Sequence, residues 1–300
     1  MKPTTLQDYK QRLIRVLVYI QDNLDTSLSL ESLSRVACLS PYHFHRVFSG
    51  MIGETLQGLI RRLRMERAAW QLLNQGDSVV QIALGAGYES HEAFTRAFVQ
   101  AFAMSPTRFR QAEARSPKIP ARSAIHFEPG KPARSFRSTR LSSTAMNINI
   151  KTIPTIRVAA VRHVGPYRNV GDAWNRICSL LGSEGHMGPG TQMIGICYDD
   201  PDATSAKAIR YDACVSVDAD FEAFGELTIR EISGGDYAVT THEGPYEQLN
   251  HTYRHLLGKW VPRSGRELAE APCFEIYLTD PESTEPADLL TDVYAPLSPA

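Results

Sequence analysis

The stretch Ser40-Pro-Tyr-His-Phe-His-Arg-Val-Phe48 returns fifty positions later as Ser90-His-Glu-Ala-Phe-Thr-Arg-Ala-Phe98. One serine, one arginine and two phenylalanines recur at matching positions of the two copies. A serine just before a run with helical periodicity is a typical N-cap. Each copy follows a shorter helical stretch across a two-residue break, Cys38-Leu39 or Tyr88-Glu89. Two helices joined so closely predict a helix-turn-helix, so we expect the chain to contain two such units.

Helical spacing divides the second helix of each unit into two faces. In residues 41–49 the inward stripe is Phe44, Val47 and Phe48, and the face expected to be exposed carries Tyr42, His45, Arg46 and Ser49. In residues 91–98 the exposed set is His91, Glu92, Thr95 and Arg96. Arginine can bond guanine in the major groove, and His or Tyr can reach a base or a phosphate. A polar face can also be merely solvated, but arginine at the same register of both helices favours double-stranded DNA.

Residues 56–74 are predicted to form a helix that joins the two units. Nineteen helical residues span about 28 Å. One turn of DNA is about 34 Å, so both recognition helices could enter successive major-groove faces. Four arginines of this helix are candidates for phosphate contact: Arg61, Arg62, Arg64 and Arg67.

Residues 10–113 resemble the DNA-binding domain of the AraC/XylS family of transcription regulators. The resemblance is carried by Leu33, Ala37, Ser40, Phe44, Arg46, Phe48, Arg64, Ala83, Gly87-Tyr88, Ser90, Phe94, Arg96, Phe98, Ser105-Pro106 and Phe109-Arg110. It implies binding as a two-headed monomer or through dimers, with RNA polymerase as a further candidate partner. The base-contacting positions that it implies are Tyr42, His45, Arg46, His91, Thr95 and Arg96. His45 and His91 stand where some relatives have glutamine, so the DNA sequence that is read does not carry over.

The charge of the chain is divided between two halves. Residues 1–148 carry 20 Lys and Arg against 11 Asp and Glu, a net charge of +9, and residues 149–300 carry 12 against 22, a net charge of −10. A basic half beside an acidic half suggests a polyanionic partner for the first. The expected domains are a double helix-turn-helix domain at 1–113, a basic, flexible Ser/Pro/Arg-rich linker at 114–147 and a second domain at 148–300.

The second domain also contains an internal repeat. Gly165-Pro-Tyr167 returns as Gly244-Pro-Tyr246, and residues 194–201 return at an offset of 80 as residues 274–281. Strand-like runs are Arg157–Val164, Met193–Tyr198, Tyr211–Val217, Leu227–Ile232, Tyr237–Glu243, Phe274–Tyr277 and Asp292–Tyr294, and helices fit Asn169–Leu181 and Tyr246–Val261. The predicted fold is therefore multi-domain: an all-α double helix-turn-helix domain followed by an α+β domain of two β-α-β-β repeats.

One position distinguishes the two repeats, because Gly195 in the first corresponds to Glu275 in the second. A carboxylate in an apolar strand is costly unless it meets a partner. Strand alternation places Glu275 and Tyr277 on one face. The aromatic side chains expected to line a cleft between the copies are Tyr167, Trp174, Tyr198, Tyr246, Tyr253 and Trp260. Such a site suits a lipophilic cation, whereas a glutamate bonded to backbone or to an arginine is the alternative interpretation.

Residues 148–297 resemble the GyrI-like small-molecule-binding domain. The resemblance rests on the order of five motifs: Gly165-Pro166-Tyr167, residues 195–201, residues 210–214, Gly244-Pro245-Tyr246 and residues 274–278. It implies that Glu275 contacts a cationic ligand. A DNA reader placed before such a domain is similar to regulators of the right origin-binding protein type.

The leading hypothesis is thus a DNA-binding transcription regulator, not an enzyme, modulated by a small hydrophobic or cationic effector. Two alternatives remain open. Some GyrI-like domains resemble hydrolases that use a glutamate among aromatic residues, and the acidic domain could instead sequester another protein or mask the basic DNA module. No catalytic residue, cofactor or metal site is predicted, since the five cysteines are scattered and are expected to be buried free thiols. The chain has no apolar run long enough for a membrane span and no secretory signal, so we expect it in the cytoplasm, away from membranes.

Overall fold

The computed structural model describes residues 5–112, 116–138 and 146–299. Two compact units make up the chain. The helical unit comprises Gln7–Cys38 and Met51–Arg140, and the sheet unit comprises Met1–Leu6, Leu39–Gly50 and Leu141–Ala300. Most of α3 (Pro41–Ile52), which carries the first copy of the N-terminal repeat, therefore belongs to the sheet unit.

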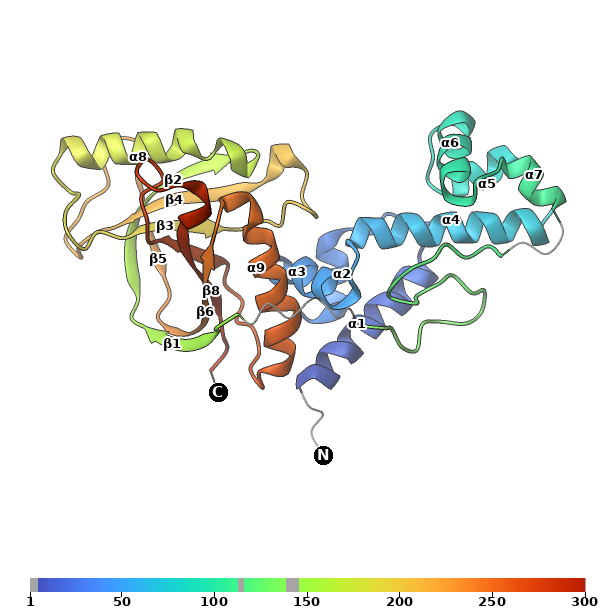
Figure 1. Ribbon diagram of the computed structural model, residues 1–300, viewed down its shortest axis with the longest axis horizontal. Helices are drawn as coiled ribbons and strands as arrows, with labels where there is room; N and C mark the ends of the chain where they lie inside the picture. The colour runs from blue at the N-terminus through green and yellow to red at the C-terminus, as the bar shows by residue number, and fades with distance from the viewer. Residues whose placement is uncertain (1–4, 113–115, 139–145, 300) are drawn as a thin grey trace. The chain divides into compact units, whose positions relative to one another are not determined.

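Aromatic and aliphatic side chains from four helices form a core of the helical unit. Figure 1 shows the helices as coiled ribbons. The helices of this unit are α1 (Thr5–Asp22), α2 (Leu30–Ala37), α4 (Leu56–Asn74), α5 (Val79–Gly85), α6 (His91–Phe102) and α7 (Pro106–Gln111). Phe94 and Phe98 of α6 are fully buried in this core, and Phe109 of α7 joins them. A capping box between Ser78 and Gln81 begins α5, and Ser90 caps α6. These caps satisfy amide donors that each first helical turn leaves unpaired.

Three of the four arginines proposed for phosphate contact have intramolecular partners instead. Arg62 forms an ion pair with Glu54 at 2.7 Å. Arg64 donates to the backbone oxygens of Leu24 and Thr26, and Arg67 donates to that of Gly85. A phosphate role for these three arginines is therefore not supported, whereas Arg61 is exposed.

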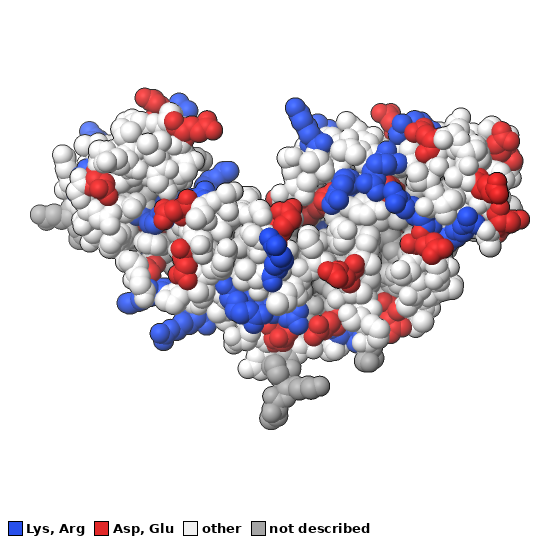
Figure 2. Space-filling model, turned by 180° about the vertical axis from the view of Figure 1, so that it is seen from behind, with Lys and Arg blue, Asp and Glu red and all other residues white. Residues whose placement is uncertain are grey.

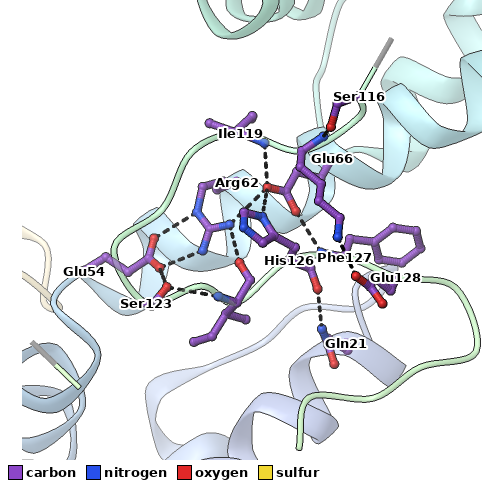
Figure 3. Close-up of polar contacts among 12 residues, drawn as sticks. Gln21, Glu54, Arg62, Glu66, Ser116, Ile119, Ser123, His126, Phe127 and Glu128 are labelled. Atoms are coloured by element: carbon purple, nitrogen blue, oxygen red, sulfur yellow. Dashed lines mark hydrogen bonds and ion pairs between the residues drawn. The ribbon is translucent and has the colours of Figure 1, made fainter. Parts of the chain in front are cut away.

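Residues 116–138 of the expected linker lack regular structure but are bonded to the helical unit (Figure 3). Glu66 of α4 is 1% exposed, and its carboxylate accepts hydrogen bonds from the amides of Ile119 and Phe127 at 2.9 and 2.8 Å. The same carboxylate meets Nδ1 of His126 at 2.9 Å. Gln21 of α1 also holds the segment: its Nε2 donates to the backbone oxygen of His126, and its Oε1 accepts from the amide of Ala133. This part of the expected linker is therefore bound to α1 and α4 by hydrogen bonds.

The sheet unit is built on eight antiparallel strands in the order β1-β6-β8-β7-β3-β4-β2-β5. The strands are β1 (Asn149–Ile153), β2 (Ile156–Val164), β3 (Met193–Cys197), β4 (Arg210–Ser216), β5 (Thr228–Ile232), β6 (Gly235–Glu243), β7 (Cys273–Tyr277) and β8 (Leu290–Pro296). Its main helices are α8 (Gly171–Ser183) and α9 (Leu249–His255), and α9 continues into a π-helical turn, Leu256–Trp260.

The two predicted repeats are confirmed as β2-α8-β3-β4 and β6-α9-β7-β8. Strands β3 and β7 pair where the two repeats meet, at the middle of the sheet. Strand β1, which was not predicted, pairs with β6 of the second repeat, and β5 pairs with β2 of the first. Strand β1 comes directly before the first repeat in the chain but pairs with the second, and β5 comes directly before the second repeat but pairs with the first. These pairings connect the two halves of the sheet.

Strand alternation gives the sheet two different faces. One face holds a core that includes Ile194, Ile196 and Phe274. The other face is covered by α8, whose Ala173, Ile177 and Leu181 pack with β2 and β4 side chains. Cys197 belongs to this second layer, so the odd-numbered positions of β3 and their partners in β7 face the helices.

None of the helices in residues 5–112, 116–138 and 146–299 is long and apolar enough to cross a membrane. Three cysteines are buried, whereas Cys178 is half-buried and Cys38 is exposed, so the expectation of buried thiols is wrong for Cys38. Figure 2 shows acidic and basic side chains interspersed over the face that it presents. The opposite net charges of the two sequence halves do not appear there as one basic and one acidic surface.

Candidate functional site

The position that distinguishes the two repeats lies at their junction. Gly195 of β3 and Glu275 of β7 are directly paired across the sheet. Glu275 is 4% exposed and comes from the apolar strand Cys273-Phe-Glu-Ile-Tyr277. A buried carboxylate at this place requires donors from several elements to offset its desolvation.

Three side chains donate to the carboxylate of Glu275. The hydroxyl of Tyr253, from α9, donates to Oε1 at 2.9 Å, and the thiol of Cys197, from β3, lies 3.3 Å from the same oxygen. The hydroxyl of Tyr277 donates to Oε2 at 2.7 Å. Each carboxylate oxygen therefore meets a phenolic donor, and the donors come from both repeats.

The hydrogen-bond chain extends outward from Tyr277. The hydroxyls of Tyr211 and Tyr277 lie 2.9 Å apart, and the indole Nε1 of Trp174 donates to Tyr211 at 3.0 Å. Since Tyr277 donates to Glu275, it accepts from Tyr211, which in turn accepts from Trp174. These residues form what we call the Glu275 cluster: Glu275, Tyr277, Tyr253, Tyr211, Trp174 and Cys197.

Gly195 provides the space for this chain. A Cβ atom at this position would lie 2.5 Å from the hydroxyl of Tyr211 and 2.7 Å from that of Tyr277. Atoms do not approach this closely without displacement, so a side chain in the first repeat would separate the two phenols. The glycine in one repeat and the glutamate in the other are thus complementary parts of one arrangement.

Aromatic rings surround the carboxylate on its outer side. Trp174 and Tyr246 contact Tyr277 edge-on, with centroids 5.5 and 5.4 Å from its ring. Tyr167 contacts Tyr211 at 6.0 Å, and its hydroxyl donates to the backbone oxygen of Asp199. Tyr167, Trp174, Tyr246 and Tyr277 are only half-buried, so this side of the cluster reaches solvent.

The electrostatics favour a negative site held by neutral donors. Burial, followed by nearby acidic groups, raises the pKa of Tyr211, Tyr253 and Tyr277 well above the usual value. These phenols therefore keep their protons and act as donors. Within the described ranges, no Lys, Arg or His side chain forms an ion pair with Glu275. The alternative of a glutamate bonded to backbone or to an arginine is not what the structure shows.

The structure brings together most of the residues proposed around Glu275: Tyr277, Trp174, Tyr246 and Tyr167. Tyr198 lies apart, since its hydroxyl donates to Asp212 at 2.8 Å and Arg162 stacks on its ring. No hydrogen bond or ring contact in the described structure joins Trp260 to the cluster. Sequence reasoning missed Tyr211 and Cys197; strand alternation could have indicated Cys197, which shares a face of β3 with Gly195.

Two other features of the described residues do not form comparable sites. A hollow of about 540 Å³ lies along the linker segment, but Lys118 and His126 in its lining are already paired with Glu128 and Glu66. No group of three His, Cys, Asp or Glu side chains in the described ranges could hold a metal ion.

The second recognition helix has the two faces that its sequence predicts. His91 and Arg96 of α6 are exposed, Thr95 is half-buried, and Phe94 and Phe98 are buried beneath them. The polar side of α6 is therefore exposed at His91 and Arg96.

The first recognition helix differs from its prediction. Phe44, Val47 and Phe48 of α3 are buried as expected. His45 and Arg46 were expected to be exposed, but only 1% and 3% of their surfaces are. Ser49 is also buried, and Tyr42 is half-buried. The expectation of an exposed face is wrong for three of these four residues, because α3 packs within the sheet unit.

Specific polar contacts cover α3. His45 Nδ1 lies 2.8 Å from Oδ2 of Asp200, and His43 Nε2 lies 2.8 Å from the backbone oxygen of Ala271. The guanidinium of Arg46 lies over the ring of Tyr253, with Cζ 3.9 Å from the centroid. Burial lowers the pKa of Arg46, but the ring of Tyr253 beneath it and the carboxylate of Asp200 favour its charged form, so the pKa is raised. Burial, helped by the charge of Arg46, lowers the pKa of His43 to about 4.

Two family models agree with this architecture. A helix-turn-helix domain family matches residues 33–112, and a family described as GyrI-like small molecule binding domain matches residues 146–298. YgiV of Escherichia coli K12, a probable transcriptional regulator, is 30% identical over 165 residues, which are 53% of this chain and 100% of YgiV. The right origin-binding protein of the same organism is 31% identical over 97 residues, 32% of this chain and 34% of that protein. EcmrR, solved with DNA in the EcmrR-RPo complex, is 19% identical with a TM-score of 0.44, covering 51% of this chain and 58% of EcmrR.

Proposed function

Because the chain belongs to the GyrI-like small-molecule-binding family and also carries an AraC-type helix-turn-helix domain, we propose that it is a transcription regulator controlled by an effector bound at Glu275. RNA polymerase stays a predicted partner. The observation that carries the effector role is the buried carboxylate of Glu275, which is held by neutral donors and faced by half-buried aromatic rings.

The chemistry of the Glu275 cluster favours a hydrophobic cation. A cation near Glu275 gains charge pairing, and the rings of Trp174, Tyr246 and Tyr277 add cation–π attraction of about 0.5–2 kcal/mol each. Phenolic donors engage both carboxylate oxygens, which leaves fewer lone pairs for a water. A general base needs a placed water that bonds directly to it. The arrangement therefore favours ligand binding over hydrolysis.

The effector role can be tested by titrating the full chain with tetraphenylphosphonium and following tryptophan fluorescence, which Trp174 should report. We expect Glu275→Gln to weaken binding by at least roughly tenfold, a factor that corresponds to about 1.4 kcal/mol. Glu231→Gln, which removes the same charge from an exposed position of β5, should leave the affinity unchanged. Equal affinities for the wild type and Glu275→Gln would refute the carboxylate's role.

DNA reading is proposed for His91, Thr95 and Arg96 of α6 and for Tyr42, His45 and Arg46 of α3. A duplex selected from a random library by the full chain gives the target. Arg96→Ala should cost about 1–3 kcal/mol of binding and relax the preference at one base pair. Arg176→Ala, which removes an arginine from the surface of α8, is the matched control. An unchanged footprint and affinity for Arg96→Ala would contradict the role of α6.

A further inference from the structure

We propose that the docking of α3 on the sheet unit is an inhibited state of the DNA reader, and that a cation bound at Glu275 opposes this docking. The inference rests on the proposed function, since it states how the effector site would control DNA reading. Helices α3 and α9 lie side by side (Figure 1), and Arg46, one of the side chains proposed to read bases, lies against Tyr253 of α9.

The docked helix cannot use its reading residues. His45 is held by Asp200, and Arg46 is held by the ring of Tyr253. Both side chains are almost fully buried, whereas Arg96, the counterpart of Arg46 on α6, is exposed. Base contacts in the major groove require the side chains of a recognition helix to be exposed. Reading by α3 therefore requires that these contacts with the sheet unit break.

The fit between α3 and the sheet unit is close at one point. Gly50 of α3 meets Gly258 of the π-helical turn, so closely that a Cβ on Gly50 would lie 2.6 Å from the Cα of Gly258. A Cβ on Gly258 would lie 2.5 Å from the Cα of Gly50. Backbone meets backbone here, so neither clash can be relieved by turning a side chain. A single added methyl group should therefore separate α3 from the sheet unit.

One side chain connects the docked helix with the effector site. The hydroxyl of Tyr253 donates to Glu275, while its ring carries the guanidinium of Arg46. Arg46 is thus a buried cation that contacts the same tyrosine as the carboxylate that we assign to a cationic effector. Two cations in one buried region repel each other, and low solvent access strengthens the repulsion. Effector binding should therefore weaken docking, and by linkage the undocked state should bind the effector more tightly.

The test uses the full-length variant Gly258→Ala, whose added methyl group should separate α3 from the π-helical turn. We call this variant and Gly50→Ala the wedge variants. Gly182→Ala, in α8, is the control, since nothing lies within 4 Å of a Cβ placed there. Hydrogen exchange of the amides of residues 41–50 should accelerate in Gly258→Ala and not in Gly182→Ala. The affinity for the selected DNA duplex should rise by roughly 5- to 150-fold, the usual range of coupling between two sites. The affinity for tetraphenylphosphonium should rise as well.

A second pair of variants tests the connection through Tyr253. In the wild type, tetraphenylphosphonium should accelerate exchange in residues 41–50. Tyr253→Phe keeps the ring beneath Arg46 but loses the bond to Glu275, so the probe should accelerate exchange by a smaller factor. Gly50→Ala places the added methyl group on α3 instead of on the π-helical turn. The same measurements can therefore be made with this variant if Gly258→Ala does not fold.

Three results would overturn the inference. Unchanged exchange in both wedge variants would show that α3 is not restrained by docking. Faster exchange without tighter DNA binding would show that docking does not limit DNA reading. Weaker binding of the probe by the wedge variants would contradict the antagonism. Failure of the proposed function is distinct, because then neither the wild type nor a wedge variant would select any DNA sequence.

Discussion

Gly195→Ala tests the assembly of the Glu275 cluster most simply. The added Cβ would lie 2.5 Å from the hydroxyl of Tyr211, whereas ordinary contacts begin at 3.4 Å, so the phenol must move by roughly 0.9 Å. The hydroxyl of Tyr277 must move too, which strains its 2.7 Å bond to Glu275. Overpacking of this kind costs about 1–3 kcal/mol, and a lost hydrogen bond to a charged group costs about 1.5–3 kcal/mol.

We therefore expect Gly195→Ala to lower the free energy of unfolding of the sheet unit by about 2–4 kcal/mol. For a unit of this size, each kcal/mol lowers Tm by about 2–4 °C. Urea and thermal unfolding followed by circular dichroism measure both quantities. Gly182→Ala, an open helical position, should be neutral or stabilising by up to about 1 kcal/mol. If Gly195→Ala unfolds within about 0.5 kcal/mol of the wild type, the range that ordinary surface substitutions show, the spatial role of this glycine is refuted.

Two further predictions concern buried groups elsewhere in the chain. Glu66→Gln should destabilise the helical unit by about 3–5 kcal/mol, because Arg62 and two backbone amides lose their anionic partner. Limited proteolysis should then cleave residues 116–138 faster, and unchanged cleavage would show that Glu66 does not hold this segment. The pKa of His43 is lowered to about 4 from 6.5, so the unfolded chain binds more protons and stability is lost as the pH falls from 6.5 towards 4. Between pH 7 and 5 the free energy of unfolding falls by about 2 kcal/mol for this reason. In urea unfolding, His43→Gln should lose about 2 kcal/mol less than the wild type over the same pH range. An identical pH dependence of the two proteins would contradict the burial of a neutral His43.

Patterns within one stretch of sequence predicted the fold well. The offsets of 50 and 80 residues located both pairs of repeats, and period-2 and period-3.6 patterns located most elements. Strand β1 was missed because four of its five residues are exposed, which leaves no apolar alternation to recognise. The anchoring of residues 116–138 was missed because Glu66 binds mainly backbone amides, which every sequence provides.

In the candidate site too, residues on one strand could be predicted, whereas contacts between distant parts of the chain could not. Glu275 and Tyr277 could be predicted because they lie on one strand, and the comparison of repeats singled out their position. Tyr211 could not be found in this way, since its bond to Tyr277 joins residues 66 positions apart. The polar face of α3 indicated that something polar would cover it, but helical periodicity does not tell whether the partner is DNA or Asp200 and Tyr253.

The central claim is that a ligand at Glu275 changes the affinity for DNA. The most direct measurement is the fluorescence anisotropy of a labelled, selected duplex, titrated with the wild-type chain and with Glu275→Gln, with and without saturating tetraphenylphosphonium. We expect the probe to raise the DNA affinity of the wild type by roughly 5- to 150-fold and to leave that of Glu275→Gln unchanged. The claim is contradicted if the probe leaves the wild-type affinity unaltered or shifts both proteins equally.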